Sequence, residues 1–343
     1  MRDVVALDIS TMMPAGEGVN PGGRQLRTSP ASAGCGFHIT RFGGVPEEKQ
    51  APCSGSEACL TSRDLHGAPQ TSAATFACFS LLKHTTLSRV NTGNMQESGK
   101  KVILITGATS GIGLETARML ARQGWRVILS GRRDADGEEQ AQQITAEGGE
   151  AIYIHGDVAD EDSVKELHEK AIAAWGHLDA AVNNAGISND AALFADLKTE
   201  NFRQMLELNV MGVFWSMQHQ LRHMESRGFG RIINLASIAG RRGILYQGSY
   251  VATKHAVIGM TETAAIEYAT KGITVNAIAP GAIKTKILND AIQAGKYDEE
   301  SIAAMFPEKR MGDPEDIART VSYILESPYM TGSVIGVDGG FCA

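Results

Sequence analysis

The fold of this chain is decided at residues 102–113, which read VILITGATSGIG. The first five residues are apolar or β-branched, as in a buried strand, and a helical pattern follows through Gln123. The glycines between them have the spacing GxxxGxG. Glycine lets the backbone approach a pyrophosphate closely, and a helix N-terminus offers free N–H groups and a favourable dipole. The stretch predicts a strand, a phosphate-binding turn and a helix, although such a turn alone is weak evidence for a nucleotide site.

The remainder of the chain repeats this alternation of strand and helix. Further strands are predicted over 126–130, 151–155, 178–182, 231–236, 273–279 and 333–337, and helices over 136–147, 160–175, 199–227 and 250–270, with a last helix beginning at Asp313-Pro314-Glu315. Strands that alternate with helices of this length favour a right-handed, parallel, doubly wound sheet. We therefore expect an α/β fold of the Rossmann type, with about seven strands flanked by helices and ligands at the carboxyl ends of the strands.

The second strand ends in Ser130-Gly131-Arg132-Arg133. In a dinucleotide fold an acidic residue near this point would bind the ribose 2′-hydroxyl of NAD. Arginine instead pairs bidentately with phosphate, so the pair favours NADP. Two alternatives stay open: the arginines are simply solvated, or Asp134 and Asp136 just beyond them alter the preference.

A tyrosine and a lysine stand four residues apart at Tyr250 and Lys254, with Ser237 thirteen residues before the tyrosine. At this spacing both side chains lie on one helix face. An ammonium beside a phenol stabilises the phenolate, so we expect the Tyr250 pKa to be lowered and Tyr250 to act as a general acid or base. The Ser237 hydroxyl would hold the same substrate oxygen. Taken alone, the spacing favours an ordinary amphipathic helix with a surface lysine; the motifs upstream change that interpretation.

Composition excludes several classes of protein. The net charge is −7 with no long basic run, so we expect no nucleic acid partner, and no apolar run approaches a membrane span. The five cysteines are scattered without CxxC pairing or metal-ligand spacing, which indicates reduced thiols, no metal site and a cytoplasmic protein. His219 and His223 have the spacing of metal ligands, but an exposed helix face accounts for them better.

Residues 1–94 differ in kind from the rest, being rich in small and polar residues with no sustained period. We predict an extension that is disordered or not part of the native protein, with translation starting at Met95; a regulatory tail is the alternative. Residues 95–343 would form one catalytic domain. Within it, residues from about 284 to 311 are loosely patterned and predict a mobile lid over a partly apolar substrate, or else a plain surface excursion.

Together these features resemble the short-chain dehydrogenase/reductase family over about residues 100–343. The motifs that carry the resemblance are TGxxxGIG at 106–113, NNAG at 183–186, Asn209, Ser237, YxxxK at 250–254 and Pro280-Gly281. Each motif is modest alone, but their order and spacing make coincidence very improbable. Nothing in residues 1–94 resembles the family.

The resemblance implies a role for each matching residue. Tyr250 would exchange the proton, Ser237 would orient the substrate oxygen, and Lys254 would bind the nicotinamide ribose. Asn209 would hold a water that links Lys254 to solvent. The implied cofactor contacts are Gly107, Ser110, Gly111, Ile112, Gly113, Arg132, Asp157, Val158, Asn183, Gly186, Tyr250, Lys254, Pro280, Gly281, Ile283 and Thr285.

The expected activity is hydride transfer between a nicotinamide and a carbonyl or secondary alcohol. We favour an NADPH-dependent reductase of a 3-oxoacyl-type or small ketone, acting as a homodimer or homotetramer on a small-molecule substrate. The alternatives are an NAD-linked secondary alcohol dehydrogenase and a catalytically silent dinucleotide-binding scaffold. The complete set of Asn209, Ser237, Tyr250 and Lys254 argues against the scaffold. The sequence does not select the substrate.

Overall fold

The part of the chain that the structure describes folds around a seven-stranded, wholly parallel sheet. In this computed structural model the described residues are 99–293 and 298–343. The sheet has the strand order β3-β2-β1-β4-β5-β6-β7. Its strands are β1 (Val102–Thr106), β2 (Arg126–Gly131), β3 (Glu150–His155), β4 (Ala180–Asn183), β5 (Gly230–Leu235), β6 (Ile273–Pro280) and β7 (Val334–Val337). The predicted doubly wound α/β fold is confirmed, whereas the extension at 1–94 lies outside the described residues.

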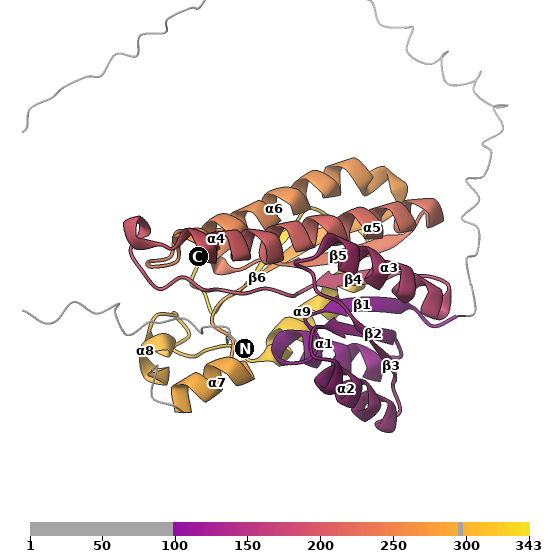
Figure 1. Ribbon diagram of the computed structural model, residues 1–343, viewed down its shortest axis with the longest axis horizontal. Coiled ribbons are helices and arrows are strands. Elements are labelled where there is room, and N and C mark those ends of the chain that lie inside the picture. Colours follow the sequence, from indigo (N-terminus) through magenta and orange to yellow (C-terminus); the bar gives the residue numbers. More distant parts are fainter. Residues whose placement is uncertain (1–98, 294–297) are drawn as a thin grey trace, which may run out of the picture. The chain divides into compact units, whose positions relative to one another are not determined.

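Helices cover both faces of the sheet (Figure 1). They are α1 (Gly111–Arg122), α2 (Asp134–Ala146), α3 (Glu161–Trp175), α4 (Thr199–Met205), α5 (Gly212–Arg227), α6 (Gly248–Tyr268), α7 (Lys286–Gln293), α8 (Glu299–Ala304) and α9 (Pro314–Leu325). One apolar core joins the sheet to α1, α2 and α9, and a second joins it to α3, α5 and α6. Because both faces are covered, the central strands are apolar on both sides rather than alternating.

The long helix predicted over residues 199–227 is interrupted. Residues Leu206–Met211 form a π-helix between α4 and α5, with Asn209 buried inside it. A π-turn accommodates one more residue than an α-turn, and such insertions are frequent at functional sites. The predicted helical span of residues 199–227 is confirmed, whereas the π-helical stretch inside it was not predicted.

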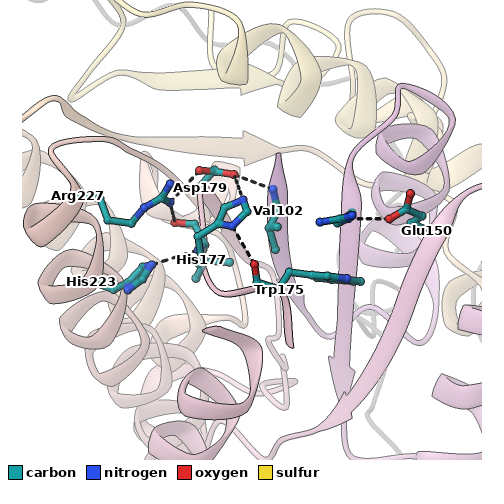
Figure 2. Close-up of polar contacts among 9 residues, drawn as sticks. Val102, Glu150, Trp175, His177, Asp179, His223 and Arg227 are labelled. Carbon is teal, nitrogen blue, oxygen red and sulfur yellow. Dashed lines mark hydrogen bonds and ion pairs between the residues drawn. The ribbon is translucent and has the colours of Figure 1, made fainter. Parts of the chain in front are cut away.

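The start of β1 is anchored at the amino ends of the strands, whereas the glycine turn lies at their carboxyl ends (Figure 2). The buried carboxylate of Asp179 accepts the Val102 N–H at 2.8 Å and pairs with Arg227 at 2.9 Å and with His177 at 3.2 Å. The neighbouring Leu178 N–H donates to Nε2 of His223 at 3.1 Å, which links this edge to α5. His223 is thus a partly buried structural group, and the expectation of an exposed face for it was wrong.

The segment predicted as a lid contains α7 and α8. Its Ile302, Phe306 and Met311 are buried in a small core of their own, against which Leu288 and Ile292 pack. Residues 294–297 lie outside the described residues. The mobility of the segment stays a prediction.

Among residues 99–293 and 298–343, no helix combines the length and apolar character that crossing a bilayer requires.

Candidate active site

A cavity of about 380 Å³ opens beside the glycine turn, over the carboxyl ends of β1, β2 and β4. Parallel strands deliver all their carboxyl ends to the same edge, which explains why segments far apart in sequence meet there. Of the residues predicted to contact the cofactor, those that line the cavity are Gly107, Ser110, Gly111, Ile112, Arg132, Asp157, Val158, Gly186 and Thr285.

The glycine turn is shaped by close packing. Gly107 has a φ of +65°, and a Cβ on it would lie 2.9 Å from the Cα of Ala185. A Cβ on Gly113 would lie 2.6 Å from the Gly107 carbonyl oxygen. Helix α1 makes its first intrahelical bond from Leu114 to Ser110, so the N–H groups before Leu114 have no acceptor within the helix. This is the geometry that binds the phosphate of a dinucleotide.

Asn184 holds the turn in place, a role that the sequence alone did not reveal. Its Nδ2 donates to the carbonyls of Thr106 at 2.9 Å and Gly107 at 3.1 Å, while its own N–H donates to the Thr106 hydroxyl at 3.1 Å. Asn183, which was predicted to lie along the cofactor, does not line the cavity. Its side chain is 3 % exposed and donates hydrogen bonds to Gln220 on α5 and to Asn234 on β5.

Both arginines of the second strand end line the cavity. Arg132, the one predicted to select NADP, has its Nη1 3.8 Å from an oxygen of Asp157. Arg133 reaches across the glycine turn and donates to the hydroxyls of Thr109 at 3.0 Å and Ser110 at 3.3 Å. It also pairs with Asp136 at 2.8 Å. Arg133 therefore joins Arg132 as a candidate phosphate ligand, and the doubled arginine was the signal for it.

Ser237, Tyr250 and Lys254 come together where β5 ends against α6. The Ser237 hydroxyl is hydrogen-bonded to the Tyr250 phenol and also accepts the Ala239 N–H at 3.1 Å. The Lys254 ammonium lies 5.6 Å from the centroid of the Tyr250 ring and donates to the Leu235 carbonyl at 2.7 Å. The predicted grouping of these three side chains is present in the structure; their catalytic roles stay predictions.

The electrostatics of this trio differ from the expectation. Burial raises the pKa of the Tyr250 phenol above its ordinary value, and the hydrogen bond with Ser237 only partly opposes this. Burial also lowers the pKa of Lys254 to about 8. The expected lowering of the Tyr250 pKa is not found, because burial of the phenol outweighs it and the Lys254 ammonium donates its hydrogen bond to the Leu235 carbonyl.

Asn209 fastens the loop after β4 to the helix that carries Tyr250. Its amide oxygen accepts the Ile187 N–H at 2.8 Å, and its amide nitrogen donates to the Ile187 carbonyl at 2.8 Å. The same nitrogen lies 3.2 Å from the hydroxyl of Thr253. A Cβ on Gly186 would lie 3.4 Å from both Asn209 Oδ1 and Lys254 Nζ, so these groups flank one small space beside the loop. The predicted water relay is untested.

The remaining predicted cofactor residues lie apart from the cavity lining. Pro280 is buried at the end of β6, and Ile283 is 8 % exposed. Gly281 lines a separate cavity of about 350 Å³ next to Phe306. Of the segment 280–285, only Thr285 reaches the first cavity, where it faces Gly111. No cluster of possible metal ligands occurs within the part of the chain that the structure describes.

Comparison with known proteins agrees with this geometry. A family model described as enoyl-(acyl carrier protein) reductase matches residues 107–342. A 2,5-dichloro-2,5-cyclohexadiene-1,4-diol dehydrogenase of Sphingobium indicum is 38% identical over 252 residues, which are 73% of this chain and 100% of that protein. A 3-oxoacyl-[acyl-carrier-protein] reductase of Staphylococcus epidermidis is 40% identical over 244 residues, 70% of this chain and 98% of that protein. The solved structure of ElxO with NADP bound is 36% identical, covers 71% of this chain and 99% of its own, and has a TM-score of 0.68.

The parallel sheet, the glycine turn and these relatives place the chain in the short-chain dehydrogenase/reductase family. It is an NAD(P)-dependent oxidoreductase.

Proposed function

We propose that this protein is an NADPH-dependent reductase of a ketone, with Tyr250 as the proton donor. The observation that carries the proposal is the trio of Ser237, Tyr250 and Lys254 beside a cavity with a glycine turn at one end. The raised pKa of Tyr250 keeps its phenol protonated at neutral pH, the form that donates a proton to a carbonyl oxygen.

The residues of the cavity fit a dinucleotide. The glycine turn admits no Cβ at Gly107 or Gly113, and free N–H groups at the start of α1 face a pyrophosphate site. Arg132 and Arg133 supply the positive charge that a 2′-phosphate requires, which favours NADP over NAD. ElxO, the similar solved structure, was determined with NADP bound. When bound, the nicotinamide supplies the hydride, and the protein positions and protonates the substrate.

The roles of the side chains follow from their contacts. The Ser237 hydroxyl, bonded to the phenol of Tyr250, holds the substrate oxygen within reach of the phenolic proton. Lys254, whose pKa is lowered to about 8, carries a proton that is readily exchanged near pH 8. Asn209 fixes the loop that borders the site and adjoins Lys254, so we assign it the solvent end of the proton path.

The substrate class that we favour is a 3-oxoacyl-type or small cyclic ketone. The two similar proteins are named for a 3-oxoacyl group and for a cyclic diol, which differ in size but share the secondary alcohol or ketone. One observation favours the alternative, an NAD-linked alcohol dehydrogenase: Arg132 faces Asp157 and Arg133 pairs with Asp136, which reduces the charge offered to a phosphate.

We further infer a cytoplasmic homodimer or homotetramer assembled through α5 and α6, and no nucleic acid partner. Phe214 on α5 and Ile266 on α6 support the assembly, because they are large apolar side chains exposed by 40% and 81%. The net charge of −7 supports the absence of a nucleic acid partner. Gel filtration with light scattering tests the assembly; a monomer at micromolar concentration contradicts it.

The test of the activity uses the purified full-length chain, NADPH and NADH in parallel, and a panel of cyclic ketones and acetoacetyl thioesters. Nicotinamide absorbance reports turnover. We expect faster turnover with NADPH, and in Tyr250→Phe a loss of about 10²–10⁴-fold in kcat, because general acid catalysis disappears. Cofactor binding, followed by NADPH fluorescence, should persist. Tyr323→Phe, at an exposed tyrosine on α9, is the matched control and should leave kcat unchanged.

Either of two results refutes an assignment. Near wild-type turnover in Tyr250→Phe removes the acid role from Tyr250. A clear NADH preference means that the two arginines are compensated by Asp157 and Asp136, and it favours the oxidative alcohol dehydrogenase.

A further inference from the structure

The backbone N–H of Tyr250 is bound by a residue sixty positions earlier in the chain. Helix α6 begins at Gly248, and its first intrahelical bond runs from Val251 to Gln247 at 2.8 Å. The N–H groups before Val251 have no acceptor within the helix. The N–H of Tyr250 donates instead to Oδ2 of Asp190 at 2.8 Å.

Capping α6 with Asp190 costs folding stability. Asp190 is 4 % exposed, and its second carboxylate oxygen, Oδ1, is buried with no hydrogen-bond partner among the described residues. A buried carboxylate that is only partly satisfied lowers stability. The local cap position, Gln247, makes no side-chain cap bond, although a serine or asparagine there would cap the helix at lower cost. Stability alone therefore does not account for a carboxylate at this position.

The loop that carries Asp190 is itself held firmly. Asn209 binds both backbone groups of Ile187 at the start of the loop. The carbonyl of Asn189 accepts a hydrogen bond from Asn201 at 3.0 Å, and the Asn189 side chain donates to Gln204 at 2.8 Å. Asp190 is thus positioned by the π-helix and by α4, and it transmits their position to α6.

The backbone of Tyr250 is gripped on both sides. Its N–H is bound by Asp190, and its carbonyl accepts the hydroxyl of Thr253 at 2.8 Å. That hydroxyl in turn accepts from the amide of Asn209 at 3.2 Å. The direction of the Cα–Cβ bond of Tyr250 sets the position of its phenol. A small rotation of the first turn of α6 therefore displaces the phenol oxygen relative to Ser237.

We propose that Asp190 is a positioning residue for Tyr250: its carboxylate, at the N-terminal end of α6, fixes the first turn of that helix so that the phenol meets the substrate oxygen held by Ser237. A negative charge at a helix N-terminus is also attracted to the positive end of the helix dipole, which strengthens the contact between Asp190 and α6. This inference rests on the proposed function for its effect on turnover, but the contact with the Tyr250 N–H can be tested without turnover.

The experiment compares Asp190→Ala, Asp190→Asn and the wild type as full-length chains. In Asp190→Ala we expect kcat to fall by about 10- to 100-fold, the cost of misplacing a reacting group by a fraction of an ångström to one ångström. The KM and the dissociation constant for NADPH should stay within about twofold of the wild type, because Asp190 does not line the cavity of the glycine turn. Asp190→Asn, which keeps an acceptor oxygen, should recover most of the lost kcat. Asp196→Ala, in the same connection but exposed, is the matched control and should change nothing.

Hydrogen exchange provides the readout that is independent of turnover. The amide of Tyr250 has its only described acceptor in Asp190, so peptides covering the first turn of α6 should exchange faster in Asp190→Ala than in the wild type. In Asp190→Asn the protection should be largely restored.

The outcomes separate cleanly. Wild-type kcat in Asp190→Ala overturns the proposal, and so does equal loss of kcat in the alanine and asparagine variants. A loss of NADPH binding that parallels the loss of kcat also overturns it, because it indicates general damage to the fold. If the wild type turns over no ketone, the proposed function has failed; unchanged exchange at the first turn of α6 then overturns the positioning role, and faster exchange supports it.

Discussion

Replacing Gly113 with alanine should destabilise the protein and weaken cofactor binding together. The added Cβ would lie 2.6 Å from the carbonyl oxygen of Gly107 and 2.6 Å from Nδ2 of Asn184, about 1 Å inside a normal contact. Neither neighbour yields easily, since one is backbone and the other holds two carbonyls. Overpacking costs about 1–3 kcal/mol and a weakened Asn184 hydrogen bond about 1 kcal/mol, whereas the gain in helix propensity is about 1 kcal/mol. The net loss is about 1–3 kcal/mol.

Thermal unfolding and NADPH titration measure the two effects. A loss of this size lowers Tm by roughly 2–12 °C for a domain of this length. The control is Gly259→Ala, also a glycine within a helix, where an added Cβ meets nothing within 4 Å. It should raise stability by up to about 1 kcal/mol through propensity alone. If Gly113→Ala is as stable as the wild type and binds NADPH equally well, the close packing of the glycine turn is not what shapes the site.

Two further predictions concern buried and charged groups outside the trio. Burial lowers the pKa of His168 from 6.5 to about 4, so the folded state favours neutral imidazole. The contribution of neutral His168 to the free energy of unfolding is fully present above pH 6.5. It is lost as the pH falls toward 4, which lowers the free energy of unfolding by up to about 3 kcal/mol. Denaturant unfolding between pH 7 and 4 should therefore show a shallower decline in His168→Gln than in the wild type, and parallel curves would contradict the burial argument. Arg133→Ala should raise the KM for NADPH and leave that for NADH nearly unchanged, because the guanidinium at the glycine turn would bind the extra phosphate; steady-state kinetics with both cofactors checks this, and an equal rise in both would assign Arg133 to the turn itself.

The fold followed from patterns that are local in sequence. Apolar runs, glycine turns and helical periods mark each element, and the handedness of parallel crossovers leaves few ways to assemble them. The fold was therefore predictable without a structure. The π-helical stretch at 206–211 was not predicted; within it Asn209 binds Ile187, 22 positions earlier in the chain, a contact that no local pattern specifies.

The site was predictable as a set of residues and less so as a geometry. The motif NNAG named two adjacent asparagines, but only the structure separates Asn184, which holds the glycine turn, from Asn183, whose side chain points behind the sheet. Side-chain direction at a strand end depends on the register of that strand, which the motif does not carry. The direction of the Tyr250 pKa was missed for a related reason: the spacing of Tyr250 and Lys254 places them on one helix face, but it does not tell how deeply the phenol is buried or which acceptor the ammonium binds.

The anchor at the start of β1 sets how closely the chain can be trimmed. The Val102 N–H donates to the Asp179 carboxylate, and the Val102 carbonyl accepts the Asp179 N–H. The Lys101 carbonyl accepts the Arg126 N–H at 2.9 Å. A fragment that begins at Lys100 keeps all these bonds. One that begins at Val102 deletes the Lys101 carbonyl and replaces a neutral amide with a charged ammonium against a buried carboxylate. Tags, fusion partners and protease sites therefore belong before Lys100. A chain shortened from its N-terminus should begin no later than Lys101.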